Sequence, residues 1–140
     1  MEDTQRSDML GQRQVRLEKI EALKKLGVEI YPAKSYKQFH NGEILNNFEK
    51  YEGQEVCLAG RVVAWREHGQ LLFGNIMDQT GTIQIMIREN ELVEDLTKGY
   101  LGFDKLTLLD LADFVEVYGT IGKTKTGEIS VMVKNIRLLS

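Results

Sequence analysis

Three segments of the chain, 71–77, 81–88 and 127–133, alternate apolar and polar residues. A period of two is typical of a β-strand that buries one face and exposes the other. The residues of the apolar parity are Leu72, Ile76, Ile83, Ile85, Ile87, Ile129, Val131 and Val133. Three half-buried strands are therefore predicted, and the pattern is least regular in 71–77.

Two more strands complete a β-region that begins near Gln54. The five predicted strands are 56–65, 70–77, 82–88, about 113–122 and 128–139. Gly60 in the first strand suits a sharp bend at a barrel corner. Between the third and fourth strands, residues 90–109 lose the alternation and predict one or two helical turns. This order is that of the five-stranded oligonucleotide-binding (OB) barrel, so a mainly β fold with a helix between strands three and four is predicted.

The residues before the barrel read as an α-helical extension. Apolar residues recur at three-residue steps in 12–26, which predicts an amphipathic helix that ends at Gly27. Pro32 imposes an extended path, and Asn41 is an acceptable N-cap for a second short helix. The predicted division is a disordered tail at 1–11, a helical extension and linker at 12–53, and the barrel at 54–140.

Composition limits the class of protein. Hydrophobic residues make up 42% and charged residues 28% of the 140 residues, as in a globular protein, and no apolar run is long enough for a membrane span. The polar, acidic N-terminus is not a secretory signal. Cys57, the single cysteine, lies in a strand pattern, which predicts a buried reduced thiol and a cytoplasmic protein. The net charge of −3 argues against a broad electrostatic nucleic-acid surface, so any such contact must be local.

Candidate chemistry lies on the outer parity of the predicted strands. Phe73, Gln84 and Glu128 share that side, and Arg66 is placed in the turn between strands one and two. The OB barrel binds its ligands on strands two and three and the adjoining loops. An aromatic ring there can stack on a nucleobase, while polar side chains bind its edge. A one-residue shift of strand two would instead put Phe73 in the core. Glu128 as a solvated turn residue and Gln84 as polar surface are the plainer alternatives.

Hydrogen-bonding chemistry favours one base. A carboxylate only accepts hydrogen bonds, whereas a side-chain amide both donates and accepts. Uracil presents an N3–H donor between two carbonyl oxygens, so Glu128 would bind the N3–H and Gln84 or Arg66 a carbonyl. Cytosine presents a lone pair at N3, which a carboxylate repels. The set therefore predicts a preference for uracil over cytosine.

Other motifs carry no activity. Gly119 to Thr124 imitates the end of a phosphate-binding P-loop, but Val117 replaces its first glycine and a hairpin follows instead of a helix. His40, His68 and Cys57 lack metal-ligand spacing, and His68 has no nucleophile and acid beside it. No catalytic residue, metal site or cofactor is predicted in this chain.

The residues also carry a resemblance to a family. The chain resembles the N-terminal part of bacterial-type class II lysyl-tRNA synthetases over nearly all of residues 13–140. The long helix with its Tyr31-Pro32 linker separates it from aspartyl and asparaginyl synthetases, whose barrels are similar. The matching segments are Arg16 to Pro32, Leu58 to Val62, Gly69 to Phe73, Gly81 to Gln84 and Lys123 to Val131.

The resemblance implies a tRNA anticodon-binding domain. In the family, the residues that match Phe73, Gln84 and Glu128 contact the central uracil of the lysine anticodon, and an arginine that matches Arg66 assists. Two departures stand out: Gln70 and Ala112 occupy positions where family members often have lysine and glycine. Candidate contacts to the tRNA backbone are Arg13, Arg16, Lys19, Lys24, Lys123 and Lys125, although a solvated face is the alternative for the helix.

The family also implies what this chain does not contain. Lysine–tRNA ligation needs a separate catalytic domain that uses ATP and Mg²⁺ and mediates homodimerisation, so the 140-residue chain is expected to be inactive and monomeric alone. Three alternatives remain. They are the anticodon-binding domain of an aspartyl- or asparaginyl-type synthetase, a sequence-tolerant single-strand nucleic-acid binder on the same fold, and a barrel whose outer face docks a protein.

Overall fold

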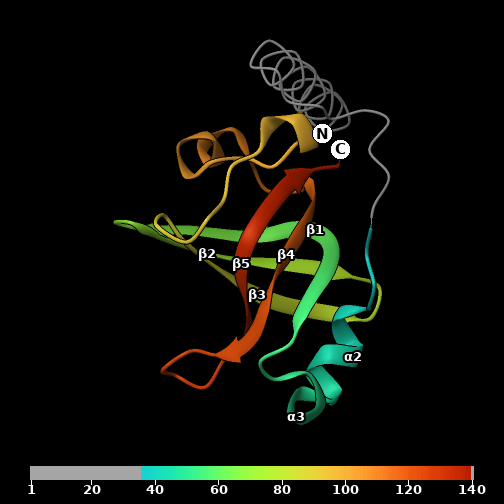
Figure 1. Cartoon of the computed structure of the whole chain (residues 1–140). Helices are drawn as coiled ribbons and strands as arrows, with labels where there is room; N and C mark the ends of the chain where they lie inside the picture. The colour runs from blue at the N-terminus through green and yellow to red at the C-terminus, as the bar shows by residue number, and fades with distance from the viewer. Residues whose placement is uncertain (1–35, 140) are drawn as a thin grey trace, which may run out of the picture.

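A closed barrel of five β-strands forms the body of the chain in the computed structural model, which describes residues 36–139 (Figure 1). The strands follow the order β1-β2-β3-β5-β4 around the barrel, and only β3 and β5 run parallel. Their bounds are β1 Glu55–His68, β2 Leu71–Asp78, β3 Gly81–Arg88, β4 Phe114–Lys123 and β5 Ile129–Leu138. The predicted OB barrel is confirmed, with each predicted strand present within a few residues of its predicted ends.

Strand β1 takes part in both sides of the barrel. Its first half pairs with β4 and its second half with β2, and Arg61 pairs with both. Gly60 lies immediately before this change of partner, where a Cβ atom would come within 2.8 Å of the Met77 carbonyl oxygen. The bend expected at Gly60 is therefore a point of close backbone approach.

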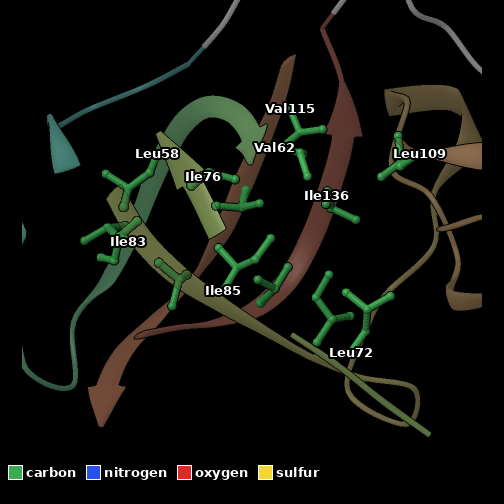
Figure 2. Packing of buried hydrophobic residues seen from close by; sticks show 14 of the residues in the cluster. Leu58, Val62, Leu72, Ile76, Ile83, Ile85, Leu109, Val115 and Ile136 are labelled. Atoms are coloured by element: carbon green, nitrogen blue, oxygen red, sulfur yellow. The ribbon is translucent and has the colours of Figure 1, made fainter. Parts of the chain in front are cut away.

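The barrel interior is filled almost entirely by aliphatic side chains. Figure 2 shows Leu58, Ile76 and Ile83 pointing toward one another between the strands. These residues are 0%, 0% and 1% exposed. Ile85 and Ile87 of β3 and Val131 of β5 are as fully buried, as their shared parity predicts. Burial of these side chains is the main source of the fold's stability.

Two short helices close one end of the barrel. Helix α2, Asn41–Asn46, inserts the fully buried Ile44 into the core, and helix α3, Phe48–Tyr51, adds Tyr51. The predicted N-cap was wrong by one residue, because His40 precedes the helix. The Asn41 amide nitrogen instead donates to the carbonyl oxygens of Ile76 and Gly81, both at 3.1 Å. Asn41 therefore ties α2 to strands β2 and β3.

Asp78 strengthens the same junction. Its carboxylate accepts hydrogen bonds from the Asn41 N–H at 2.9 Å, the Thr80 N–H at 2.8 Å and the Lys37 ammonium at 3.1 Å. Burial alone raises the pKa of the Asp78 carboxyl, but the hydrogen bonds from Asn41 and Thr80 outweigh it and hold that pKa well below its usual range. The charged carboxylate thus anchors the segment before α2 to the β2–β3 turn.

The connection from β3 to β4 runs outside the barrel. It contains two 3₁₀ helices, η1 Leu96–Lys98 and η2 Phe103–Leu108, which confirms the predicted helical turns. Leu101 and Leu106 of this connection are buried in the core cluster. The Leu101 N–H also donates to the Ile136 carbonyl oxygen at 2.8 Å, which fixes the connection along β5.

The predicted N-terminal tail, the amphipathic helix at 12–26 and the basic side chains on it lie outside the described residues. The division into tail, extension and barrel therefore stays a prediction. No helix among residues 36–139 is long and apolar enough to cross a membrane.

One backbone position bears on a departure from the family pattern. Ala112, just before β4, has a φ of 74°, in the left-handed region that favours glycine. Its N–H donates to the Val62 carbonyl oxygen at 2.8 Å, so the turn keeps this conformation despite the alanine. A Cβ atom in this conformation costs on the order of 1 kcal/mol.

Replacing Ala112 with glycine should therefore raise the free energy of unfolding, by up to about 1 kcal/mol, because the strain of the Cβ atom disappears. Urea unfolding followed by circular dichroism measures the change. The control is Ala64→Gly in β1, where extended backbone makes glycine unfavourable and a loss of about 0.5–1 kcal/mol is expected. Equal destabilisation by both substitutions would show that Ala112 is not strained.

Candidate nucleic-acid interface

The outer face of β2 and β3 carries the candidate residues. On β2, Leu72 and Ile76 face the core at 1% and 0% exposure, whereas Phe73 between them is only partly buried. Residues of opposite parity in a strand point to opposite faces of the sheet. Phe73 therefore lies on the outer face, and the one-residue shift that would have buried it does not occur.

Phe73 sits in a row across three strands. It pairs directly with Arg66 of β1 and with Met86 of β3. Directly paired residues of antiparallel strands project from the same face, with Cβ atoms about 4.5–5.5 Å apart. An arginine and an aromatic ring are thus side by side on the outer face, with the buried Met86 on the other side of the ring.

Arg66 differs from its predicted position. It was expected in the turn between the first two strands, but β1 extends through His68 and the turn consists of Gly69 and Gln70. Gly69 has a φ of 65°, as the first residue of a two-residue hairpin turn requires. Arg66 is therefore held within a strand, opposite Phe73, and is more firmly placed than a turn residue.

Gln84 lies in the next row of the same face. It pairs with Asn75 of β2 and, across the parallel pair, with Ser130 of β5. Gln84 and Asn75 are both partly buried. Two side-chain amides consequently stand together one row from Phe73. Sequence reasoning did not propose Asn75 for the site, although it shares the parity of Phe73 on β2.

Glu128 is the last residue of the β4–β5 loop and is exposed. It was predicted to begin the fifth strand, but β5 starts at Ile129. It precedes Ser130, the direct partner of Gln84, by two residues. Two residues of chain span at most about 7 Å, so the backbone of Glu128 lies near the start of the row that contains Gln84 and Ser130.

The polar side chains of this face have no partner among residues 36–139. None of the side chains of Arg66, Gln84 and Glu128 forms a hydrogen bond or ion pair there. The donors of the guanidinium and the amide, and the acceptors of the carboxylate, remain available to a ligand.

The outer face on the other side of the barrel is closed. Ala59 of β1 and Glu116 of β4 are each 4% exposed, and Arg137 of β5 is 9% exposed. The Glu116 carboxylate accepts from Arg137 Nε at 2.9 Å and from the Tyr36 N–H at 2.6 Å. The Arg137 guanidinium also lies 5.0 Å from the centroid of the Tyr36 ring. The segment before α2 thus runs over β1, β4 and β5, whereas the face around Phe73 stays open.

Cys57 belongs to this closed face and is 4% exposed, as the predicted buried thiol requires. The Gln38 N–H donates to the Cys57 carbonyl oxygen at 2.9 Å. Burial, reinforced by the nearby Glu116 carboxylate, raises the pKa of the Cys57 thiol to about 12. The thiol is therefore protonated near neutral pH and is a poor nucleophile.

The remaining candidates separate into two groups. Lys123 ends β4, and its ammonium lies 4.5 Å from the centroid of the Phe48 ring, which is a cation–π contact. Lys125 lies in the β4–β5 loop and is exposed. Arg13, Arg16, Lys19 and Lys24 lie outside the described residues, so only the two lysines near Glu128 can be placed.

The motifs that sequence analysis set aside lie on or beside the barrel strands. The P-loop-like residues from Gly119 lie along strand β4 instead of before a helix. His68 ends β1, and His40 lies 3.9 Å from Asp78. Among residues 36–139, no group of three or more histidine, cysteine, aspartate or glutamate side chains could hold a metal ion.

Comparison with known proteins identifies the domain. Residues 56–139 match the model of the tRNA anticodon family, described as an OB-fold nucleic acid binding domain. The chain belongs to this family. The match begins one residue after the start of β1 and continues to the end of the described residues, so it covers the whole barrel.

Relatives of this domain occur within longer proteins. The chain is 41% identical over 126 residues to a lysine–tRNA ligase of Carboxydothermus hydrogenoformans, covering 90% of the chain and 25% of the relative. A lysine–tRNA ligase of Thermoanaerobacter pseudethanolicus is 35% identical over 127 residues, 90% of the chain and 24% of the relative. That of Christiangramia forsetii is 36% identical over 130 residues, 92% of the chain and 22% of the relative.

The resemblance to lysyl-tRNA synthetases is thereby confirmed. The chain spans about a quarter of the length of these ligases. It is similar to their anticodon-binding OB domain.

Proposed function

We propose that this chain recognises the anticodon of a lysine tRNA by reading its central uracil. Phe73 stacks on the base, Glu128 accepts a hydrogen bond from N3–H, and Gln84 or Arg66 binds a carbonyl oxygen. The supporting observation is the strand register. It brings Arg66 beside Phe73 and Gln84 into the next row, on an open face of a nucleic-acid-binding barrel.

The proposal separates affinity from selectivity. Stacking on Phe73 contributes about 1–3 kcal/mol and tolerates any base. Selectivity must come from the base edge, because only the edge differs between uracil and cytosine. Glu128 is suited to this role since its carboxylate has no partner among residues 36–139 and can accept the N3–H of uracil.

Contacts to the tRNA backbone are few in this proposal. Lys123 and Lys125 lie in the same hairpin as Glu128, and Lys125 can bind a phosphate. Lys123 can do so once its ammonium leaves the Phe48 ring. Arg13, Arg16, Lys19 and Lys24 are proposed as further backbone contacts. A net charge of −3 predicts modest affinity and a shallow salt dependence for the chain alone.

The whole protein is proposed to be a cytoplasmic, homodimeric lysine–tRNA ligase that uses ATP and Mg²⁺. Residues 36–139 offer no acidic cluster that could hold Mg²⁺. In this proposal ATP and Mg²⁺ bind in a separate catalytic domain, and the 140-residue chain binds tRNA without ligating lysine.

Binding to anticodon stem-loops tests the proposal. A lysine anticodon stem-loop is expected to bind at least about tenfold more tightly than the same stem-loop with the central uracil replaced by cytosine, because the Glu128 carboxylate loses its donor. Fluorescence anisotropy with the 140-residue chain measures both affinities. Equal affinities, shared by single-stranded DNA, would support the sequence-tolerant binder, and no binding would support a protein-docking barrel. Tighter binding of an aspartate stem-loop, which shares the central uracil, would favour the aspartyl-type alternative.

Replacing Phe73 with alanine should weaken binding of the uracil and cytosine stem-loops alike, by about 1–3 kcal/mol, because stacking is lost for either base. The same anisotropy titration measures this. Phe73→Leu is the matched control for lost apolar volume, since it keeps a large side chain but has no ring. Wild-type affinity in Phe73→Ala would exclude this residue from the interface.

Replacing Glu128 with glutamine should mainly relax the choice of base, because the amide can also donate to the cytosine N3 lone pair. The expected ratio of the two stem-loop dissociation constants moves toward one, while uracil binding falls little. Glu52→Gln, at the exposed C-cap of α3, makes the same change of charge and should leave the ratio as in the wild type. An unchanged ratio in Glu128→Gln would remove Glu128 from base recognition.

A further inference from the structure

The β4–β5 loop holds the backbone of Glu128 through a single residue, Thr124. The Thr124 N–H donates to the Glu128 carbonyl oxygen at 3.0 Å, and the Glu128 N–H donates to Thr124 Oγ1 at 3.2 Å. The Gly127 N–H donates to the Thr124 carbonyl oxygen at 2.9 Å, with Gly127 in the left-handed region at φ 85°. These bonds close a tight turn within the five-residue loop from Thr124 to Glu128.

A second contact connects Glu128 to β5, beside the outer face that carries Phe73 and Gln84. The hydroxyl of Ser130 donates to the Glu128 carbonyl oxygen at 3.2 Å. Ser130 is fully buried and is the direct partner of Gln84 across β3 and β5. The Glu128 backbone is therefore fixed from the loop side by Thr124 and from the strand side by Ser130. Gln84 and Glu128 keep a defined spacing through this chain of contacts.

The side chain of Glu128 lacks any such support. It is exposed and makes no hydrogen bond or ion pair among residues 36–139. The backbone therefore fixes the point from which the side chain projects, and no side-chain contact adds to it. A carboxylate must approach the N3–H of a stacked base within hydrogen-bonding distance, so a loose backbone would weaken this bond more than it weakens stacking.

We propose that Thr124 is a positioning residue for base discrimination, and that its hydroxyl fixes the Glu128 backbone so that the carboxylate meets the base edge. This inference rests on the proposed reading of a central uracil. Thr124 itself does not touch the base. Its hydroxyl also lies 3.0 Å from that of Thr126, and either group can be the donor, so Thr124 Oγ1 can accept from Glu128 while it donates to Thr126.

The test compares variants of the 140-residue chain on the uracil and cytosine stem-loops. Thr124→Val keeps the shape of the side chain and both bonds of the Thr124 backbone but removes the hydroxyl. It should lower the ratio of the cytosine to the uracil dissociation constant by about 2- to 10-fold, because one hydrogen bond is lost. A lower ratio means weaker preference for uracil. Thr124→Ser restores the hydroxyl and should restore the wild-type ratio.

Two controls separate positioning from a general loss of structure. Thr107→Val makes the same change in η2, between β3 and β4, which Figure 1 shows at the end of the barrel opposite the β4–β5 hairpin. This variant should keep the wild-type ratio. In a Glu128→Ala background, Thr124→Val should cause no further change in the ratio, because the residue through which it acts is absent. Thermal unfolding of each variant verifies that it is folded.

The outcomes distinguish the two proposals. A wild-type chain that does not prefer uracil would contradict the proposed function. A wild-type preference that Thr124→Val leaves intact, or that Thr124→Ser fails to restore, would overturn the positioning role alone. An effect of Thr124→Val that persists at full size in the Glu128→Ala background would overturn it as well.

Discussion

Closure of the barrel around an aliphatic interior is the constraint that sets the outer face of β2 and β3, on which we propose that the base binds. Leu72 and Ile76 of β2 and Ile83 and Ile85 of β3 must all face inward to fill that interior. Side chains alternate along a strand, and a slip of one residue would expose the entire apolar set. The register is therefore strongly fixed, and it places Phe73 and its neighbours of the same parity outside. The core thus determines which side chains are offered to a ligand.

A buried ion pair helps to cover the outer surface on the other side of the barrel. Glu116 and Arg137 hold the segment that begins at Tyr36 over β1, β4 and β5. A buried pair of this kind contributes little net stability, because desolvation opposes the attraction, but removing one partner would leave an uncompensated charge. It therefore fixes where the segment lies. The open face on β2 and β3 is bordered by the hairpin that presents Glu128.

The sequence predicted the strands, their order and the parity of Phe73 and Gln84, because alternation reports burial directly. It misplaced Arg66, since the β1–β2 register shifts between Val62 and Ala64 and disrupts the simple pattern. Asn41 and Thr124 make hydrogen bonds to backbone atoms distant in sequence or across a loop, which no periodicity reveals. Asn75 shares the parity of Phe73, so its pairing with Gln84 needed only the register.

Mapping of backbone amide chemical shifts by nuclear magnetic resonance tests the location of the interface most directly. The ¹⁵N-labelled chain would be titrated with a lysine anticodon stem-loop. The largest changes are expected at Phe73, Gln84 and Glu128, with smaller ones along their strands. Changes concentrated at Cys57 and Glu116 of the closed face, with none around Phe73, would contradict an interface on β2 and β3.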